Sequence, residues 1–174
     1  MPDAEILFET KWIRVCREGV WDYVRRPQSR FSVGILAITQ QEEVVLVEQM
    51  RVPVGTRVIE IPAGLVGDEP DHLGESLEET ARRELLEETG YGAAKMEFLI
   101  CSPSTPGLAM EFMNIFVATG LVRETDGGGT EGEDIVIHHV PLPDLRGWLA
   151  EKQAAGIEVD ARLCAALWLA KIPC

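Results

Sequence analysis

Residues 74–91, GESLEETARRELLEETGY, constrain the fold more than any other segment, because both ends and one buried face of a helix can be read from them. Ser76 and Glu79 have the spacing of a capping box, and Gly90 suits the left-handed residue that ends a helix. Apolar residues recur on one side at helical spacing: Leu77, Ala81 and Leu85. The segment therefore predicts a helix from Ser76 to Gly90 with one face against a core.

The same segment carries six glutamates. Glu84, Glu87 and Glu88 are three or four residues apart, so their carboxylates converge at the edge of the apolar stripe, where like charges destabilise a helix. Partly buried carboxylates without partners are costly. A hard divalent cation would remove that cost, since Mg²⁺ and Mn²⁺ prefer carboxylate, water and phosphate oxygens. The alternative is an acid-rich surface helix that Arg82 and Arg83 neutralise.

The spacing resembles the Nudix box, G-x5-E-x7-R-E-U-x-E-E-x-G-U, in which U is apolar or aromatic. Here Glu75 is followed by seven residues and then by the run Arg83-Glu84-Leu85-Leu86-Glu87-Glu88-Thr89-Gly90-Tyr91. One position departs from the pattern, because the opening glycine would fall on Glu69. The run Pro62-Ala63-Gly64 resembles the usual source of that glycine, so five extra residues lie between Gly64 and Glu75. They are expected to lengthen a surface loop, at little cost in stability.

Segments outside the box are similar to the ADP-ribose and nucleoside-diphosphate-sugar pyrophosphatase branch of that family: VVLVEQMR, EIPAG, STPGLAME and GGGTEGEDIVIHHVPL. The resemblance implies a Nudix-type α/β/α sandwich with a mixed β-sheet. It also implies metal-dependent hydrolysis of ADP-ribose, or of a related nucleoside diphosphate sugar, to a nucleoside monophosphate and a sugar phosphate. GDP-mannose or another sugar nucleotide is the alternative substrate. The alternative of a different class is a non-catalytic Nudix-fold module that senses a nucleotide.

The resemblance assigns the metal site and its supporting residues. The expected ligands of Mg²⁺ or Mn²⁺ are Glu84, Glu87, Glu88 and the backbone carbonyl of Ala63. Arg83 is expected to orient a neighbouring glutamate and so to act in catalysis with Glu87. Glu75 is expected to be a structural partner of Arg83.

A general base is expected outside the box, on the glycine-rich loop that would close over the substrate. Glu131 is preferred there over Glu133, although acids in such a loop often serve only solubility. Glu111 is a further candidate base, and its alternative role is to bind the terminal ribose or sugar. Arg51 is expected to bind a phosphate, because a guanidinium group suits two phosphate oxygens; the alternative is an ordinary surface arginine.

Alternating and β-branched runs predict a hairpin at residues 12–25 and further strands at 30–38, 44–50, 57–64, 95–102, 111–122 and 134–142. Helices are also expected at 143–154 and 159–170. We divide the chain into N-terminal strands at residues 1–29 and a Nudix hydrolase domain at 30–174. By resemblance, the N-terminal strands are expected to form a homodimer.

Composition limits the partners and the compartment. A net charge of −13 disfavours nucleic acid and anionic membranes as partners. The acidic amino terminus lacks the pattern of a signal peptide, and the four cysteines lack metal-site spacing, so a cytoplasmic protein with reduced thiols is expected.

Other aromatic residues and histidines have less definite roles. Trp12, Trp21 and Phe31 either stack on a base or, as is more common for aromatic residues in hairpins, fill a core or a subunit contact. His138 and His139 are expected to be structural, because neither has a partner at metal-ligand spacing.

Overall fold

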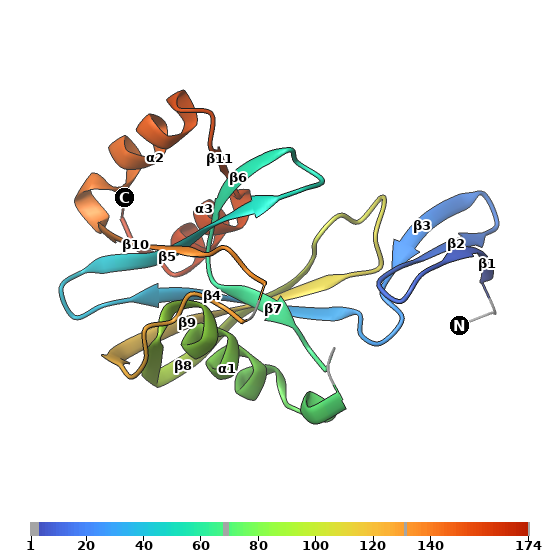
Figure 1. Cartoon of the computed structure of the whole chain (residues 1–174), viewed down its shortest axis with the longest axis horizontal. Helices are drawn as coiled ribbons and strands as arrows, with labels where there is room; N and C mark the ends of the chain where they lie inside the picture. The colour runs from blue at the N-terminus through green and yellow to red at the C-terminus, as the bar shows by residue number, and fades with distance from the viewer. Residues whose placement is uncertain (1–3, 68–69, 131, 174) are drawn as a thin grey trace.

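The computed structural model describes residues 4–67, 70–130 and 132–173 (Figure 1). Its strands are β1 (Glu5–Glu9), β2 (Arg14–Glu18), β3 (Trp21–Arg25), β4 (Phe31–Ile38), β5 (Glu43–Arg51), β6 (Thr56–Glu60), β7 (Ala63–Leu65), β8 (Tyr91–Pro103), β9 (Phe112–Arg123), β10 (Val136–Pro141) and β11 (Glu158–Val159). Its α-helices are α1 (Leu77–Thr89), α2 (Leu145–Ala154) and α3 (Ala161–Leu169), with 3-10 turns at Pro70–His72 and Leu142–Asp144.

The larger sheet is mixed. Its strand order is β11-β6-β5-β4-β9-β8, while β10 pairs with β5 and β7 pairs with β4. Strand β4 runs parallel to β9, and β11 runs parallel to β6, whereas the other pairs are antiparallel. The prediction of an α/β fold with a mixed sheet is confirmed.

Helices cover both faces of this sheet, as Figure 1 shows for α1 on one side and for α2 and α3 on the other. Successive residues of β4 point to opposite faces. Val33 and Ile35 belong to the core beneath α1, together with Leu85. Leu36 belongs to the core beneath α3, together with Leu163. This alternation produces the expected α/β/α sandwich.

The acidic helix has the predicted ends. The Ser76 hydroxyl accepts a hydrogen bond from the Glu79 amide at 3.2 Å, and the Ser76 amide donates to the Glu79 carboxylate at 2.8 Å. Gly90 ends the helix at φ 78°, in the left-handed region. Because Ser76 itself is the cap, the first helical residue is Leu77.

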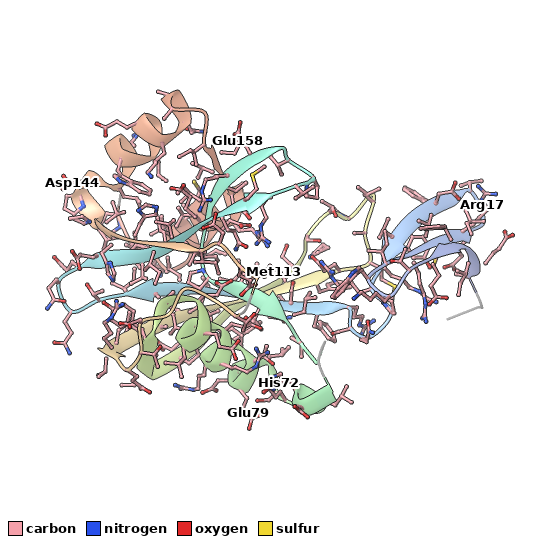
Figure 2. All side chains as sticks on the ribbon, in the orientation of Figure 1. Arg17, His72, Glu79, Met113, Asp144 and Glu158 are labelled. Carbon is pink, nitrogen blue, oxygen red and sulfur yellow. The ribbon has the colours of Figure 1, made fainter. Side chains whose placement is uncertain are left out.

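A separate three-stranded antiparallel sheet precedes the sandwich and projects from it, with Arg17 on the projecting part (Figure 2). The hairpin of β2 and β3 was predicted, but β1 was not. All residues of β1 are exposed, so it lacks the alternation of a half-buried strand. Val24 of β3 connects this sheet to the loop before β9, since its amide donates to the Leu108 carbonyl and its carbonyl accepts from the Met110 amide, both at 2.8 Å.

Two other boundaries differ from the predictions. The run 57–64 is split, because β6 ends at Glu60 and the chain then pairs with β4 as β7. The predicted helix 159–170 begins only at Ala161, after the two-residue strand β11 and the cap Asp160. Among the described residues, no helix is both long enough and apolar enough to cross a membrane.

Candidate active site

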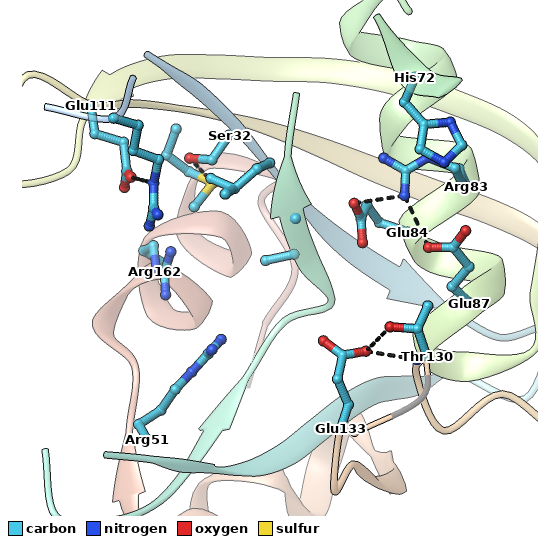
Figure 3. Close-up of a pocket in the computed structure, with 15 residues that line it drawn as sticks. Ser32, Arg51, His72, Arg83, Glu84, Glu87, Glu111, Thr130, Glu133 and Arg162 are labelled. Atoms are coloured by element: carbon cyan, nitrogen blue, oxygen red, sulfur yellow. Dashed lines mark hydrogen bonds and ion pairs between the residues drawn. The ribbon is translucent and has the colours of Figure 1, made fainter. Parts of the chain in front are cut away.

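A cavity of about 360 Å³ opens between α1, β7 and the segment before β10 on one side and α3 on the other. Figure 3 shows acidic side chains from α1 and the loop on one wall and arginines on the facing wall. The acidic wall carries Glu84, Glu87 and Glu133, together with Arg83. The arginine wall carries Arg26, Arg51 and Arg162, together with Glu111. The cavity therefore offers carboxylate and guanidinium groups to one occupant.

Strand β7 fits closely against α1 at this cavity. The Ala63 amide donates a hydrogen bond to Glu88 Oε2 at 3.0 Å. A Cβ on Gly64 would lie 1.9 Å from Glu84 Cδ, so only glycine leaves room for that carboxylate. The Ala63 amide thus holds Glu88 against the strand, and Gly64 leaves the space that Glu84 occupies.

Glu88 is the most buried of the predicted ligands, with 4% of its surface exposed. Burial raises its pKa to about 8, and the negative charges of Glu84 and Glu133 add to this rise, although the Ala63 amide and Arg51 oppose it. The three carboxylates are therefore close enough to interact, and their mutual repulsion adds to the effect of burial on Glu88.

Arg83 connects the acidic residues of α1. Its Nη1 lies 3.0 Å from Glu84 Oε1 and 2.9 Å from Glu87 Oε2, and its Nε lies 3.2 Å from Glu75 Oε2. Burial opposes the charged form of Arg83, but the three carboxylates outweigh it and raise the pKa of the guanidinium. Glu75 also pairs with His72 at 2.9 Å, so the loop that the five-residue insertion lengthens reaches the cavity.

The glycine-rich loop is held on the end of α1. The amides of Gly128 and Gly129 donate to the carbonyls of Glu88 and Glu87, both at 2.9 Å, and so satisfy two groups that a helix end leaves unpaired. Further along, Glu133 Oε2 accepts from the Thr130 amide at 2.7 Å and from its hydroxyl at 3.2 Å. Glu133 thereby lines the cavity (Figure 3).

Acidic side chains orient the arginine wall. Glu60, which is 4% exposed, accepts from Arg51 Nε at 2.6 Å and from Arg162 Nη2 at 3.0 Å. Nearby, Arg26 Nε donates to Glu111 Oε2 at 2.9 Å. Arg51 keeps its two terminal nitrogens directed into the cavity (Figure 3). This wall suits an anion with several oxygens.

The acidic wall suits a hard cation. Its donors are carboxylate oxygens, and the charges of Glu84 and Glu133 add to the burial that raises the pKa of Glu88. Among the described residues, no group of three or more Asp, Glu, His or Cys side chains is positioned to hold a metal ion by itself. A cation held here would therefore take part of its coordination from water or phosphate, as Mg²⁺ commonly does.

The structure brings most of the predicted site residues to this cavity. Glu88 accepts a hydrogen bond from the amide of Ala63, which lines the cavity. The predicted residues in the lining are 51, 63, 83, 84, 87, 111 and 133. Glu131 lies outside the described residues, so its preference as base stays a prediction. His72, Thr130, Arg26 and Arg162 also line the cavity and were not predicted. Arg162 follows the α3 cap Asp160, which gives no sign of a site in the sequence.

The predicted structural histidines and the aromatic residues lie away from the cavity lining. His138 contacts Glu48 at 2.9 Å, and His139 contacts the Tyr91 hydroxyl at 2.9 Å. Trp12 and Trp21 are largely exposed on the N-terminal sheet, and Phe31 packs beside Phe112.

Comparison with known proteins places the chain in a family. The family model "NUDIX domain" matches residues 28–159. The methanol dehydrogenase activator of Bacillus methanolicus is 35% identical, over 76% of this chain and 68% of its own length. The ADP-ribose pyrophosphatase of Bacillus subtilis (strain 168) is 36% identical, over 65% of this chain and 59% of its own length. A crystal structure of an ADP compounds hydrolase superposes with a TM-score of 0.72 and 26% identity, covering 98% of this chain and 90% of that one. The chain therefore belongs to the Nudix hydrolase family, the family of pyrophosphohydrolases that its motif predicts.

Proposed function

We propose that the protein hydrolyses the diphosphate of ADP-ribose, or of a related nucleoside diphosphate sugar, with Mg²⁺ or Mn²⁺ as its metal. The observation that carries this proposal is the division of one cavity into an acidic wall and an arginine wall. A diphosphate needs both, since guanidinium groups bind its oxygens and carboxylates hold the cation that shares its charge. The name of the Bacillus subtilis relative agrees with this substrate.

The reaction adds water across the P–O–P linkage. The water oxygen attacks one phosphorus, the bond from that phosphorus to the bridging oxygen breaks, and the bridging oxygen leaves with the other phosphate. The residues that would hold the cation are Glu84, Glu87, Glu88 and the Ala63 carbonyl. A bound divalent cation would lower the pKa of a water molecule and stabilise the charge on the phosphoryl group. Arg83 would keep Glu84 and Glu87 turned toward the site.

The attacking water must lose a proton, and we propose the loop acids as its acceptor. Among the described residues, Glu133 is the loop acid that faces the cavity, and its Oε2 is occupied by Thr130. Its Oε1 is then the oxygen that would take the proton. Glu111, paired with Arg26 on the opposite wall, is better suited to position the sugar or ribose than to act as base.

A nucleotide-sensing role is the second candidate, because one relative is named as an activator of another enzyme. Turnover separates the two functions. With Mg²⁺ or Mn²⁺, the purified protein should release nucleoside monophosphate from ADP-ribose, GDP-mannose or UDP-glucose more readily than it hydrolyses ATP. A chelator should abolish this activity. Glu88→Gln should abolish release, whereas the matched control Glu78→Gln, on the exposed side of α1, should retain it. Tight binding of a nucleotide without any turnover would refute the hydrolase and favour the sensor.

We also propose that the protein is a cytoplasmic homodimer that forms through residues 1–29. The N-terminal sheet exposes several large apolar side chains, a composition that favours a partner surface: Ile6, Leu7, Phe8, Trp12, Val20 and Trp21. Sedimentation should give twice the 19.2 kDa mass of one chain, and Phe8→Asp should reduce it to one chain. A wild-type mass near 19.2 kDa would contradict the dimer.

A further inference from the structure

We infer that Arg57 is a positioning residue that clamps the segment carrying Glu133 at the cavity, through Asp134 on one side and buried Glu48 on the other. The consequence for catalysis rests on the proposed hydrolysis. Arg57 does not line the cavity, and no part of the Nudix box contains it.

The clamp crosses three strands. Glu48 in β5 pairs with Ile59 of β6 and with Val136 of β10, so β6 and β10 lie on opposite edges of β5 (Figure 1). Arg57 comes from β6, and Asp134 lies two residues before β10. The side chain of Arg57 must therefore span β5 to reach Asp134.

All three nitrogens of the guanidinium group are used. Nε donates to Glu48 Oε1 at 2.7 Å, and Nη2 donates to the Glu48 carbonyl at 2.9 Å. Nη1 donates to Asp134 Oδ2 at 2.6 Å, and Nη2 also reaches the Asp134 carbonyl at 3.2 Å. Glu48 is a fixed base for the clamp, because its side chain is 7% exposed and also pairs with His138 and Lys152.

The other side of the clamp has little else to hold it. The Asp134 side chain is 79% exposed, and it forms no ion pair with any other described residue. Gly132, at φ 99°, gives the backbone before Glu133 unusual freedom. The glycine-rich segment is fastened at its start by Gly128 and Gly129 on α1, and Arg57 supplies the matching attachment at its end.

This arrangement gives Arg57 a role that a lysine cannot fill. An ammonium is a point charge, whereas the planar fork of arginine reaches two partners in fixed directions. A loosened segment would leave Glu133 misplaced while the metal ligands on α1 and the arginine wall stay intact. The turnover number should then fall while the Michaelis constant for the substrate stays nearly the same.

The test uses Asp134→Ala, Arg57→Lys and the double variant, with Glu97→Ala as a matched control. Glu97 also loses one exposed ion pair, with Lys95 at 2.8 Å on β8, away from the cavity. We expect kcat for ADP-ribose with Mg²⁺ to fall roughly 10- to 100-fold in each single variant, with KM within about twofold. The double variant should be no slower than the slower single variant, because both changes break one clamp. Glu97→Ala should match the wild type.

Hydrogen–deuterium exchange supplies a readout that does not depend on activity. Amides of residues 126–135 should exchange faster in the Asp134 and Arg57 variants, while those of α1 should not change. Unchanged exchange in residues 126–135 would overturn the clamp, and faster exchange with wild-type kcat would overturn its role in positioning. If the wild-type protein hydrolyses none of the sugar nucleotides, the proposed function fails, and the exchange result alone supports or overturns the clamp.

Discussion

Replacing Glu48 with glutamine removes a buried negative charge on which three cationic or ionisable groups converge. Arg57, Lys152 and His138 approach this carboxylate at 2.7, 2.8 and 2.9 Å. Burial would raise the pKa of Glu48, but the hydrogen bonds from Lys152, His138 and Arg57 lower it from 4.5 to about 2. The charged carboxylate is thus more favourable in the folded chain than in the unfolded one.

The pKa shift gives an upper limit for the size of this contribution and determines the direction of its pH dependence. The fall from 4.5 to about 2, at about 1.4 kcal/mol per pKa unit, corresponds to an upper limit of about 3–4 kcal/mol. Because the folded pKa is the lower one, this stability is fully present above pH 4.5 and is lost as pH falls toward 2. Glu48→Gln should therefore be less stable than the wild type by up to about 3–4 kcal/mol at pH 7, and by only about 1 kcal/mol at pH 3.

Urea denaturation of both proteins from pH 7 to pH 3 measures this difference directly. Glu97→Gln is the matched control, since its exposed pair with Lys95 should contribute less than about 1 kcal/mol at any pH. A stability difference between wild type and Glu48→Gln that stays constant from pH 7 to pH 3 would refute the assigned electrostatic origin.

Three further predictions follow from the site. Gly64→Ala places a Cβ 1.9 Å from Glu84 Cδ, so hydrolysis should fall on the order of 100-fold while the circular dichroism spectrum stays unchanged. The control Gly147→Ala, which has open space at its Cβ, should stay active, and an active Gly64→Ala protein would contradict the close fit. Gly127 has φ 65°, and a Cβ added to it would lie 2.4 Å from the Thr89 carbonyl carbon. Gly127→Ala should therefore lower the free energy of unfolding, measured by urea titration, by about 1–3 kcal/mol, whereas Gly107→Ala should leave it nearly unchanged. Since the pKa of Glu88 without metal is about 8, the affinity of the protein for Mg²⁺ should rise with pH up to that value. Calorimetry of Mg²⁺ binding at pH 7, in buffers of different ionisation enthalpy, should detect a proton released by the wild type and not by Glu88→Gln. Equal proton release by both proteins would contradict that assignment.

Sequence predicted the elements whose signals are local. The capping box and Gly90 gave both ends of α1, because each cap involves residues close in the chain. Alternation and β-branched runs gave β4 and β5, whose faces contact different cores. β1 was missed because it is exposed throughout. The break between β6 and β7 was missed because it depends on the pairing of β7 with β4, about thirty residues away in the chain.

The site residues that lie within one sequence motif could be predicted. Those that the fold brings together from distant parts of the chain could not. The carboxylates of α1 share one helical face, so their convergence could be predicted from spacing alone. Arg26 and Arg162 reach the cavity from opposite ends of the chain, and their partners Glu111 and Glu60 are distant in sequence. Arg57 gave no signal either, since its ion pair with Asp134 exists only after β5, β6 and β10 have come together.

The most direct test of the central claim is to identify the products that the wild-type protein releases from ADP-ribose in saturating Mg²⁺, beside Glu88→Gln under the same conditions. The acidic and arginine walls predict AMP and ribose 5-phosphate in equal amounts from the wild type, and neither from the variant. Intact ADP-ribose after incubation with folded wild-type protein, or equal product from Glu88→Gln, would contradict the account.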